Sequence, residues 1–306
     1  MKGWILATFL AALFATSSGI TSETVSAIKE DMREWLNSNS RYIGRGLRLS
    51  FHDCVSFACD GCVNLSQAAN VGLDEVIEEL ENEIIVNYQD EMSRADFWAL
   101  AGIVALEVGA TNGGTNLPEI VFKSGRVDCA ESPDDDQEFE YPNGAMDHDS
   151  MFAYMESHFG YNANQTTALM GAHALGNMHF KFSSYAGTFT TWAHKELNNQ
   201  YFSDMFEMTW MEQTFKKSEL FQYYGVDSEG QDIGARLFTD MELLYQITLD
   251  EDGSSSCTLE ECGHSDTYDL SYEYANDNDK WASDFATVFQ DLIDRGYAAD
   301  ELFIPE

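Results

Sequence analysis

The sequence has few basic residues for its length. Its 306 residues contain 16 Lys and Arg against 53 Asp and Glu, which gives a formal net charge of −37 at pH 7. A surface of this sign repels phosphate groups, so we expect no nucleic acid and no anionic membrane among its partners.

Long apolar stretches are scarce as well. The one such run, Trp4 to Phe14, follows Lys2 and is succeeded by small residues through Gly19. It is too short to span a bilayer comfortably and has the pattern of a secretory signal peptide. We therefore expect residues 1–19 to be removed and the mature protein, residues 20–306, to be extracellular and soluble.

Alternating apolar and polar residues, the mark of half-buried strands, are not convincing anywhere, and internal repeats and low-complexity linkers are absent. The length suits one unit with two lobes around a buried ligand. We expect an all-α fold with at most a short piece of sheet. Helical patterns cover Val25 to Leu36, Leu73 to Tyr88, Ser93 to Glu107, Asp147 to Phe159, Thr166 to Leu175 and Lys280 to Arg295.

The string R-L-S-F-H-D-C at residues 48–54 is the most informative in the chain. In a helix, Arg48 and His52 point the same way, with Phe51 beside them. A base can take a proton from one oxygen of a peroxide while a fixed cation stabilises the charge that grows on the other. Taken alone, such a pair is more often a solvated arginine and a structural histidine, so the rest of the site must be found downstream.

A second histidine, His173, is embedded in the apolar string A-L-M-G-A-H-A-L-G at residues 168–176. The flanking residues Gly171, Ala172, Ala174 and Gly176 are small and leave room for a flat macrocycle. An iron-ligating histidine also needs an acceptor for its other ring N–H, which fixes the tautomer and strengthens the donor.

Both strings resemble the distal and proximal signatures of the plant-type haem peroxidase superfamily, and further motifs follow in the family's order. L-F-T-D-M-E-L at residues 237–243 makes Asp240 the partner of His173, and A-N-V-G-L makes Asn70 the acceptor behind His52. The resemblance covers about Thr24 to about Tyr297. It also implies a buried structural ion pair.

That pair joins Asp96 to Arg126, in the strings S-R-A-D and S-G-R-V-D. The family's fold is helical and two-lobed, with one haem b per chain between a distal lobe (about 20–150 here) and a proximal lobe (about 151–306). By this resemblance His173 is the axial iron ligand, and Arg48, His52, Asn70 and Asp240 form the catalytic set.

The residues at several family positions match different subclasses of the superfamily. Phe51 stands where the intracellular ascorbate and cytochrome c peroxidases carry Trp, as in secreted relatives. His179 matches a histidine of the ascorbate class, but Phe182 occupies the position of the Arg that contacts ascorbate in that class. The proximal Trp of cytochrome c peroxidase aligns best with Phe189, with Trp192 as a rival. The chain thus resembles a secreted, ascorbate-peroxidase-like member, with Phe51, His179 and Phe189 expected near the haem.

A calcium site is left open by the same comparison. Asp53 and Asp60 match two acids of the distal calcium site of secreted relatives, and oxygen ligands suit this ion. The position of a ligating Ser is occupied by Cys62, which is a poor calcium ligand.

Six cysteines fit an oxidising compartment. The resemblance pairs Cys54 with Cys59. Cys257 and Cys262 would close a small loop within an acidic insertion, residues 248–265, which leaves Cys62 and Cys129 for each other. Sequence alone leaves the last two pairings open.

The resemblance implies a secreted haem b peroxidase that reduces hydrogen peroxide through a ferryl intermediate and oxidises small one-electron donors, in peroxide detoxification or the response to oxidative stress. One alternative is a non-catalytic, acidic calcium-binding or matrix protein on a peroxidase scaffold. The intact set of Arg48, His52, Asn70, His173 and Asp240 argues against it. A non-haem metalloenzyme fails because no third ligand stands at metal-binding spacing.

Overall fold

The computed structural model describes residues 20–190, 194–214, 220–248, 250 and 255–306. The predicted signal peptide, residues 1–19, and Trp192 lie outside these ranges. Among the helices within them, none has the length and apolar character needed to cross a bilayer.

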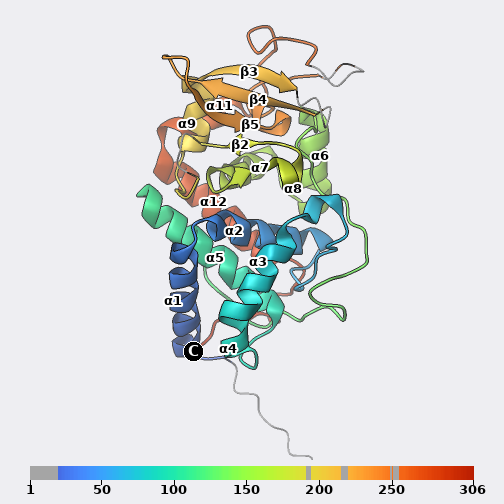
Figure 1. The fold of residues 1–306 in the computed structure, drawn as a ribbon, viewed down its shortest axis with the longest axis vertical. Coiled ribbons are helices and arrows are strands. Elements are labelled where there is room, and N and C mark those ends of the chain that lie inside the picture. Colours follow the sequence, from blue (N-terminus) through green and yellow to red (C-terminus); the bar gives the residue numbers. More distant parts are fainter. Residues whose placement is uncertain (1–19, 191–193, 215–219, 249, 251–254) are drawn as a thin grey trace, which may run out of the picture.

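Helices form most of the regular structure (Figure 1). Short turns of other helical types are η1 (Cys54–Ser56), η2 (Ala68–Asn70), η3 (Glu81–Ile85) and η4 (Gly171–Ala174). The α-helices are α1 (Ser22–Ser38), α2 (Arg41–Asp53), α3 (Leu73–Leu80), α4 (Val86–Tyr88), α5 (Arg94–Gly113), α6 (His148–Phe159), α7 (Ala163–Met170), α8 (Phe180–Ser183), α9 (Gln200–Glu207), α10 (Phe238–Met241), α11 (Tyr268–Asn276) and α12 (Asn278–Ile293).

The six predicted helical segments are all confirmed, with shifted ends. The segment from Leu73 to Tyr88 is divided by the π-helical turn η3, and the segment from Thr166 to Leu175 ends in the 3₁₀ turn η4. The boundary shifts follow from caps: Ser93, for example, accepts the backbone N–H of Asp96 and so starts α5 at the next residue.

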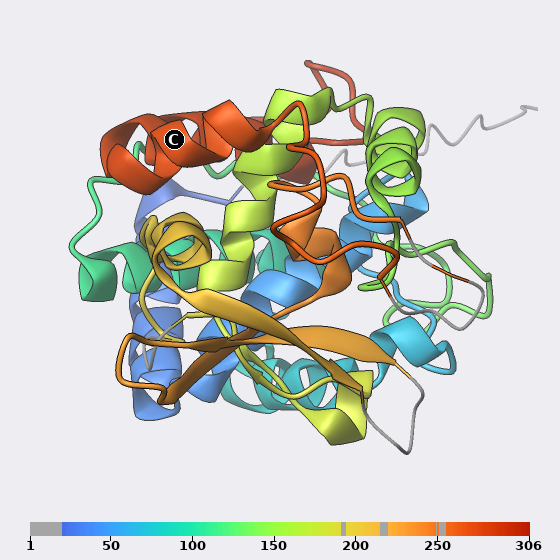
Figure 2. The ribbon, with the colours of Figure 1, turned by 90° about the horizontal axis from the view of Figure 1, so that it is seen from above.

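The fold is mostly helical, as expected, but the described residues also contain five strands, which is more sheet than the short piece predicted. β3 (Thr209–Thr214), β4 (Phe221–Val226) and β5 (Asp232–Arg236) form an antiparallel sheet, and β1 (Asn177–Met178) pairs with β2 (Gly187–Thr188). The sheet lies at one end of the molecule in Figure 1 and in front in Figure 2. β3 is almost entirely exposed, so it carries no alternation that a sequence pattern could reveal.

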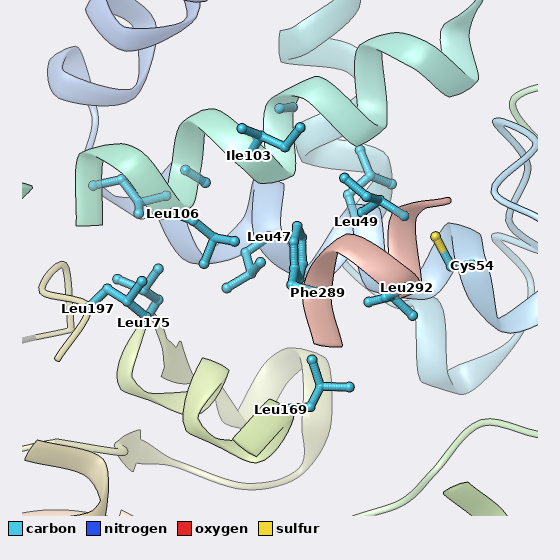
Figure 3. Close-up of a cluster of buried hydrophobic side chains, with 14 of the residues drawn as sticks. Leu47, Leu49, Cys54, Ile103, Leu106, Leu169, Leu175, Leu197, Phe289 and Leu292 are labelled. Atoms are coloured by element: carbon cyan, nitrogen blue, oxygen red, sulfur yellow. The ribbon is translucent and has the colours of Figure 1, made fainter. Parts of the chain in front are cut away.

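The core lies where α2, α5 and α12 meet (Figure 3). α5 is apolar on every side and is buried nearly throughout, as expected for a helix surrounded by others. Leu47 of α2, Ile103 of α5 and Phe289 of α12 pack in this cluster. In Figure 1, α1 to α5 occupy one half of the molecule, and α7, α9, α11 and the sheet the other, with α12 between them.

One close contact joins the two halves, and the C-terminus lies in the same half as α1 (Figure 1). A Cβ on Gly44 of α2 would lie 2.7 Å from the Cα of Gly176, just after η4. The C-terminal end of the chain returns to α1, where the backbone N–H of Ser22 donates to Glu306 at 2.9 Å. A lobe boundary near residue 150 stays a prediction, because the last residues of the proximal half pack on the distal one.

All three disulfides expected from the sequence are present: Cys54–Cys59, Cys62–Cys129 and Cys257–Cys262. Part of the acidic insertion, residues 249 and 251–254, lies outside the described residues. An isolated antiparallel β-bridge between Tyr245 and His264 joins the two ends of this insertion. The Asp96–Arg126 ion pair is likewise confirmed, at 2.8 Å between two buried side chains.

We expect Gly171→Ala to destabilise the packing of α12 on η4. A Cβ at this position would lie 2.3 Å from the indole Nε1 of Trp281, which is fully buried and donates to Ala168. Overpacking of this kind costs about 1–3 kcal/mol in the free energy of unfolding, measured by urea titration. Gly263→Ala is the control, because a Cβ there meets nothing within 4 Å; equal stability of both variants would contradict the expectation.

Candidate active site

Helix α2 places Arg48 and His52 one turn apart on the same face, as the sequence predicts. The Nε of Arg48 donates to the Nε2 of His52 at 3.3 Å. Its two terminal nitrogens donate to the backbone carbonyls of Val71 at 3.2 Å and Ala69 at 2.5 Å. The guanidinium is therefore held rigidly beside the imidazole.

Asn70, from η2, lies behind His52. The Nδ1–H of His52 donates to the Oδ1 of Asn70 at 2.7 Å, which leaves Nε2 as the unprotonated ring nitrogen. The Asn70 amide in turn donates to the carbonyl of Asn64 at 2.8 Å and to the Tyr141 hydroxyl at 3.2 Å. This network fixes both the tautomer and the orientation of the ring.

The electrostatic setting keeps His52 neutral. Burial, and after it the charge of Arg48, lower its pKa to about 3, although the hydrogen bond to Asn70 opposes the shift. Burial, with the nearby charge of Arg45, lowers the pKa of Arg48 to about 10, so the guanidinium stays charged at neutral pH. A neutral base and a permanent cation thus stand side by side.

On the other side, η4 carries His173 and α10 carries Asp240. The Nδ1–H of His173 donates to the Oδ1 of Asp240 at 2.7 Å. The same oxygen accepts the Tyr201 hydroxyl at 2.7 Å, and Oδ2 accepts the backbone N–H of Leu237. Burial alone would raise the pKa of Asp240, but His173, Arg236 and the Tyr201 hydrogen bond outweigh it and lower the pKa.

The aromatic residues predicted beside the cofactor divide into two groups. Phe51 meets the His52 ring edge-on at 5.9 Å between centroids, and Phe189 stacks on His173 at 4.2 Å. His179 is exposed at the start of α8, with its ring edge-on to Phe182, and contacts neither Phe51 nor Phe189 among the ring contacts of the described residues.

The residues present fit a haem. His173 has its Nδ1–H held by a buried carboxylate and its side chain 32% exposed, so its Nε2 is the nitrogen offered to a metal. Phe51 and Ala172 are only partly buried although they pack against the core. An axial imidazole with a carboxylate partner and apolar walls is the donor set that haem iron takes in this kind of protein.

Asp53 and Asp60 are also found near each other. Asp53 is buried, and its Oδ1 accepts the backbone N–H groups of Gly61 and Cys62, while its Oδ2 and the Oδ1 of Asp60 have no hydrogen-bond partner. Burial and the neighbouring Asp60 raise the pKa of Asp53 well above its usual value. In the described part of the chain no group of three or more His, Cys, Asp or Glu side chains forms a metal site.

Three residues of the site were not found from the sequence. Tyr141 stacks on the His52 ring at 4.9 Å, Tyr201 donates to Asp240, and Arg236 lies under the Tyr201 ring. Tyr201 stands in the string L-N-N-Q-Y-F, 28 positions after His173 and 39 before Asp240, with no spacing that links it to either. Tyr141 and Arg236 carry no sequence signal, because only the fold brings them to the two histidines.

The chain belongs to the peroxidase family, whose profile matches residues 28–244. Its relatives include members of the plant-type superfamily, and the chain is a hydrogen-peroxide-dependent peroxidase. A Candida albicans protein named "Putative heme-binding peroxidase" is 29% identical over 268 residues, which cover 84% of this chain and 81% of the relative.

Two further relatives have more specific names. The mitochondrial cytochrome c peroxidase of Candida albicans is 28% identical over 92% of this chain and 71% of its own length. The cytosolic L-ascorbate peroxidase 2 of Oryza sativa subsp. japonica is 33% identical over 46% of this chain and 51% of its own length. The chain is thus similar to both intracellular classes, although it carries Phe51.

We expect His52 to remain neutral down to about pH 3, because burial and Arg48 disfavour its charged form. Arg48→Met removes the like charge, so the pKa of His52 should rise. NMR titration of the His52 ring protons in the haem-free protein measures it. Arg48→Lys is the control that keeps the charge; a pKa that stays equally low in Arg48→Met would show that Arg48 does not act on the ring.

Proposed function

We propose that this chain is a secreted haem b peroxidase that reduces hydrogen peroxide and oxidises small one-electron donors. One observation carries the proposal: each of two histidines has its Nδ1–H held, His52 by Asn70 and His173 by Asp240, both at 2.7 Å. Each therefore offers its Nε2, one as a base and the other as a metal ligand.

The proposed cofactor rests on this chain's own residues and on the heme-binding relatives. His173 would ligate the iron, with Phe51 and Phe189 against the macrocycle, between a distal and a proximal lobe. When bound, haem supplies the redox chemistry, while the protein supplies orientation and charge. One haem per chain is proposed because, among the residues that the structure describes, His173 is the histidine whose Nδ1–H is held by a buried carboxylate.

The proposed roles on the distal side follow from the hydrogen bonds. The Nε2 of His52 would take a proton from one oxygen of hydrogen peroxide and return it to the other, which leaves as water, while a bound haem would supply the two electrons that this cleavage consumes. Arg48 lies 3.3 Å from that nitrogen and stabilises the negative charge that develops as the O–O bond breaks. Asn70 keeps the base in the correct tautomer throughout.

The electron donor is proposed as a small molecule, and the surface beside His179 bears on its class. Phe182 replaces a cation there, but Lys181 and Arg45 lie over its ring, at 4.7 and 5.3 Å from the centroid. Two cations in a chain of net charge −37 are a local exception. Glu75 pairs with both, at 2.6 Å from Arg45 and 3.6 Å from Lys181, so the three side chains carry one net positive charge and support an uncharged or singly negative donor over a cationic one.

Secretion is proposed from the N-terminal apolar run and from the cysteines. The structure has three disulfides and no free cysteine in the part of the chain that it describes. Disulfides of this number persist in oxidising compartments and are rare in the cytosol. A role in peroxide detoxification outside the cell follows.

The purified protein is expected to take up one haem per chain, seen as a Soret band that His173→Ala abolishes or shifts. His52→Leu should retain the band and slow peroxide cleavage by roughly 100- to 10,000-fold, because the base is lost. Stopped-flow absorbance after peroxide addition measures the rate, with His148→Leu as the control. A stable protein that refuses haem would favour the scaffold alternative.

We also propose one calcium ion at Asp53 and Asp60. Asp53 is buried and Asp60 is partly buried, and each has a buried oxygen that lacks a hydrogen-bond partner, which is costly unless a cation or protons neutralise the carboxylates. Burial, with Asp135 nearby, raises the pKa of Asp60 to about 6, so protonation does not neutralise it at neutral pH.

Added calcium should therefore raise the melting temperature of the full chain, and a chelator should lower it. Asp60→Asn is expected to lose most of this dependence, while Asp90→Asn, at an exposed position, should keep it. Scanning calorimetry with and without calcium makes the comparison. A melting temperature that changes with neither calcium nor chelator would contradict the proposed calcium site.

A further inference from the structure

Arg236, the last residue of β5, is a fully buried cation. Its terminal nitrogens donate to the carbonyls of Ala235 at 3.1 Å and Tyr201 at 2.7 Å, and its Nε has no partner. Desolvation of a guanidinium costs several kcal/mol unless other groups compensate. Packing alone does not explain why a charged side chain is buried at position 236.

Two aromatic faces provide part of the compensation. The guanidinium carbon lies 4.7 Å from the centroid of the Tyr201 ring and 4.9 Å from that of Trp210. Such cation–π contacts gain strength when the charge is desolvated. Burial lowers the pKa of Arg236, while Tyr201, Asp240 and Asp204 act in the opposite direction, so the cation also senses the carboxylate that holds His173.

Tyr201 connects this cation to the proximal histidine. Its ring faces Arg236, and its hydroxyl donates at 2.7 Å to the Oδ1 of Asp240, the oxygen that also accepts the Nδ1–H of His173. Burial and Asp240 raise the pKa of Tyr201, whereas Arg236 lowers it. A positive charge at a phenol ring makes its O–H a stronger donor, so Arg236 strengthens the bond from Tyr201 to Asp240.

One carboxylate oxygen therefore divides its charge between two donors. The more firmly Tyr201 and Arg236 hold Asp240, the less negative charge remains for the Nδ1–H of His173. The imidazole then has less imidazolate character and is a weaker donor at Nε2. We propose that Arg236 is a positioning residue that, through Tyr201, weakens the donor strength of His173 and so raises the reduction potential of a ligated iron.

This inference rests on the proposed haem and adds to it a way of setting the potential. The test uses the full chain loaded with haem b, and the first step is the Soret band at one haem per chain. A wild-type protein without that band overturns the proposed function itself. With the band present, the later steps test Arg236 alone.

Arg236→Met removes the charge at similar volume, and Tyr201→Phe removes the donor and keeps the ring. Each should shift the equilibrium with a redox dye roughly tenfold toward oxidised iron, which corresponds to about 59 mV. Each should also raise the iron–histidine stretching frequency of the reduced protein. Arg295→Met is the matched control, because Arg295 likewise lies over a ring, 4.7 Å from the Phe159 centroid, and does not contact Asp240.

The double variant Arg236→Met, Tyr201→Phe tests whether Arg236 acts through Tyr201. The effects of two residues on the potential are not additive when one acts through the other. If Arg236 acts through Tyr201, its replacement adds little in the Tyr201→Phe background. A wild-type potential in Arg236→Met, or a full additional shift in the double variant, overturns the proposal. If Arg236→Met fails to fold, Arg236→Lys must keep the wild-type potential while Tyr201→Phe lowers it; any other result in that pair counts against Arg236.

Discussion

The site depends on one constraint, applied twice: a hydrogen-bond acceptor fixes the Nδ1 proton of a histidine. Asn70 does this for His52 and Asp240 does it for His173. Because the two acceptors differ in charge, the two rings differ in character. A neutral amide leaves His52 a plain neutral base, whereas a buried carboxylate makes His173 a stronger donor.

Positive charge is scarce in this chain, and some of it is used in the interior. Arg126 and Arg236 are buried, and Arg48 is partly buried. Each has a different compensation: Arg126 pairs with Asp96, Arg236 lies between aromatic rings, and Arg48 donates to backbone carbonyls next to His52. The acidic side chains at the surface and the buried cations thus have different roles. The surface charge favours solubility, and each buried cation sets the local electric field around it.

The mixed ancestry suggested by the sequence has a structural counterpart. The relatives include an ascorbate and a cytochrome c peroxidase. By the sequence resemblance, Phe51 matches a Trp position of both classes, and Phe189 is the best match to the proximal Trp of cytochrome c peroxidase. Phe189 stacks on His173 but has no N–H to donate. Tyr201 supplies the second donor to the Oδ1 of Asp240, beside the Nδ1–H of His173.

Local spacing in the sequence was enough to place Arg48 and His52 on one helix face, and the family's motifs supplied Asn70 and Asp240 as partners. Those predictions rely on short-range geometry or on a pattern that the family shares. The disulfide Cys54–Cys59 was predicted in the same way.

Only the tertiary structure decided which residues surround that set. The sheet from Thr209 to Arg236 forms through pairing between strands that show little alternation of their own, and it is this sheet that carries Arg236 beneath Tyr201. Tyr141 likewise contacts His52 although it lies 89 positions later in the sequence. No periodic pattern in the sequence predicts this contact. Contacts between distant segments depend on how helices and strands pack, and no local pattern encodes them.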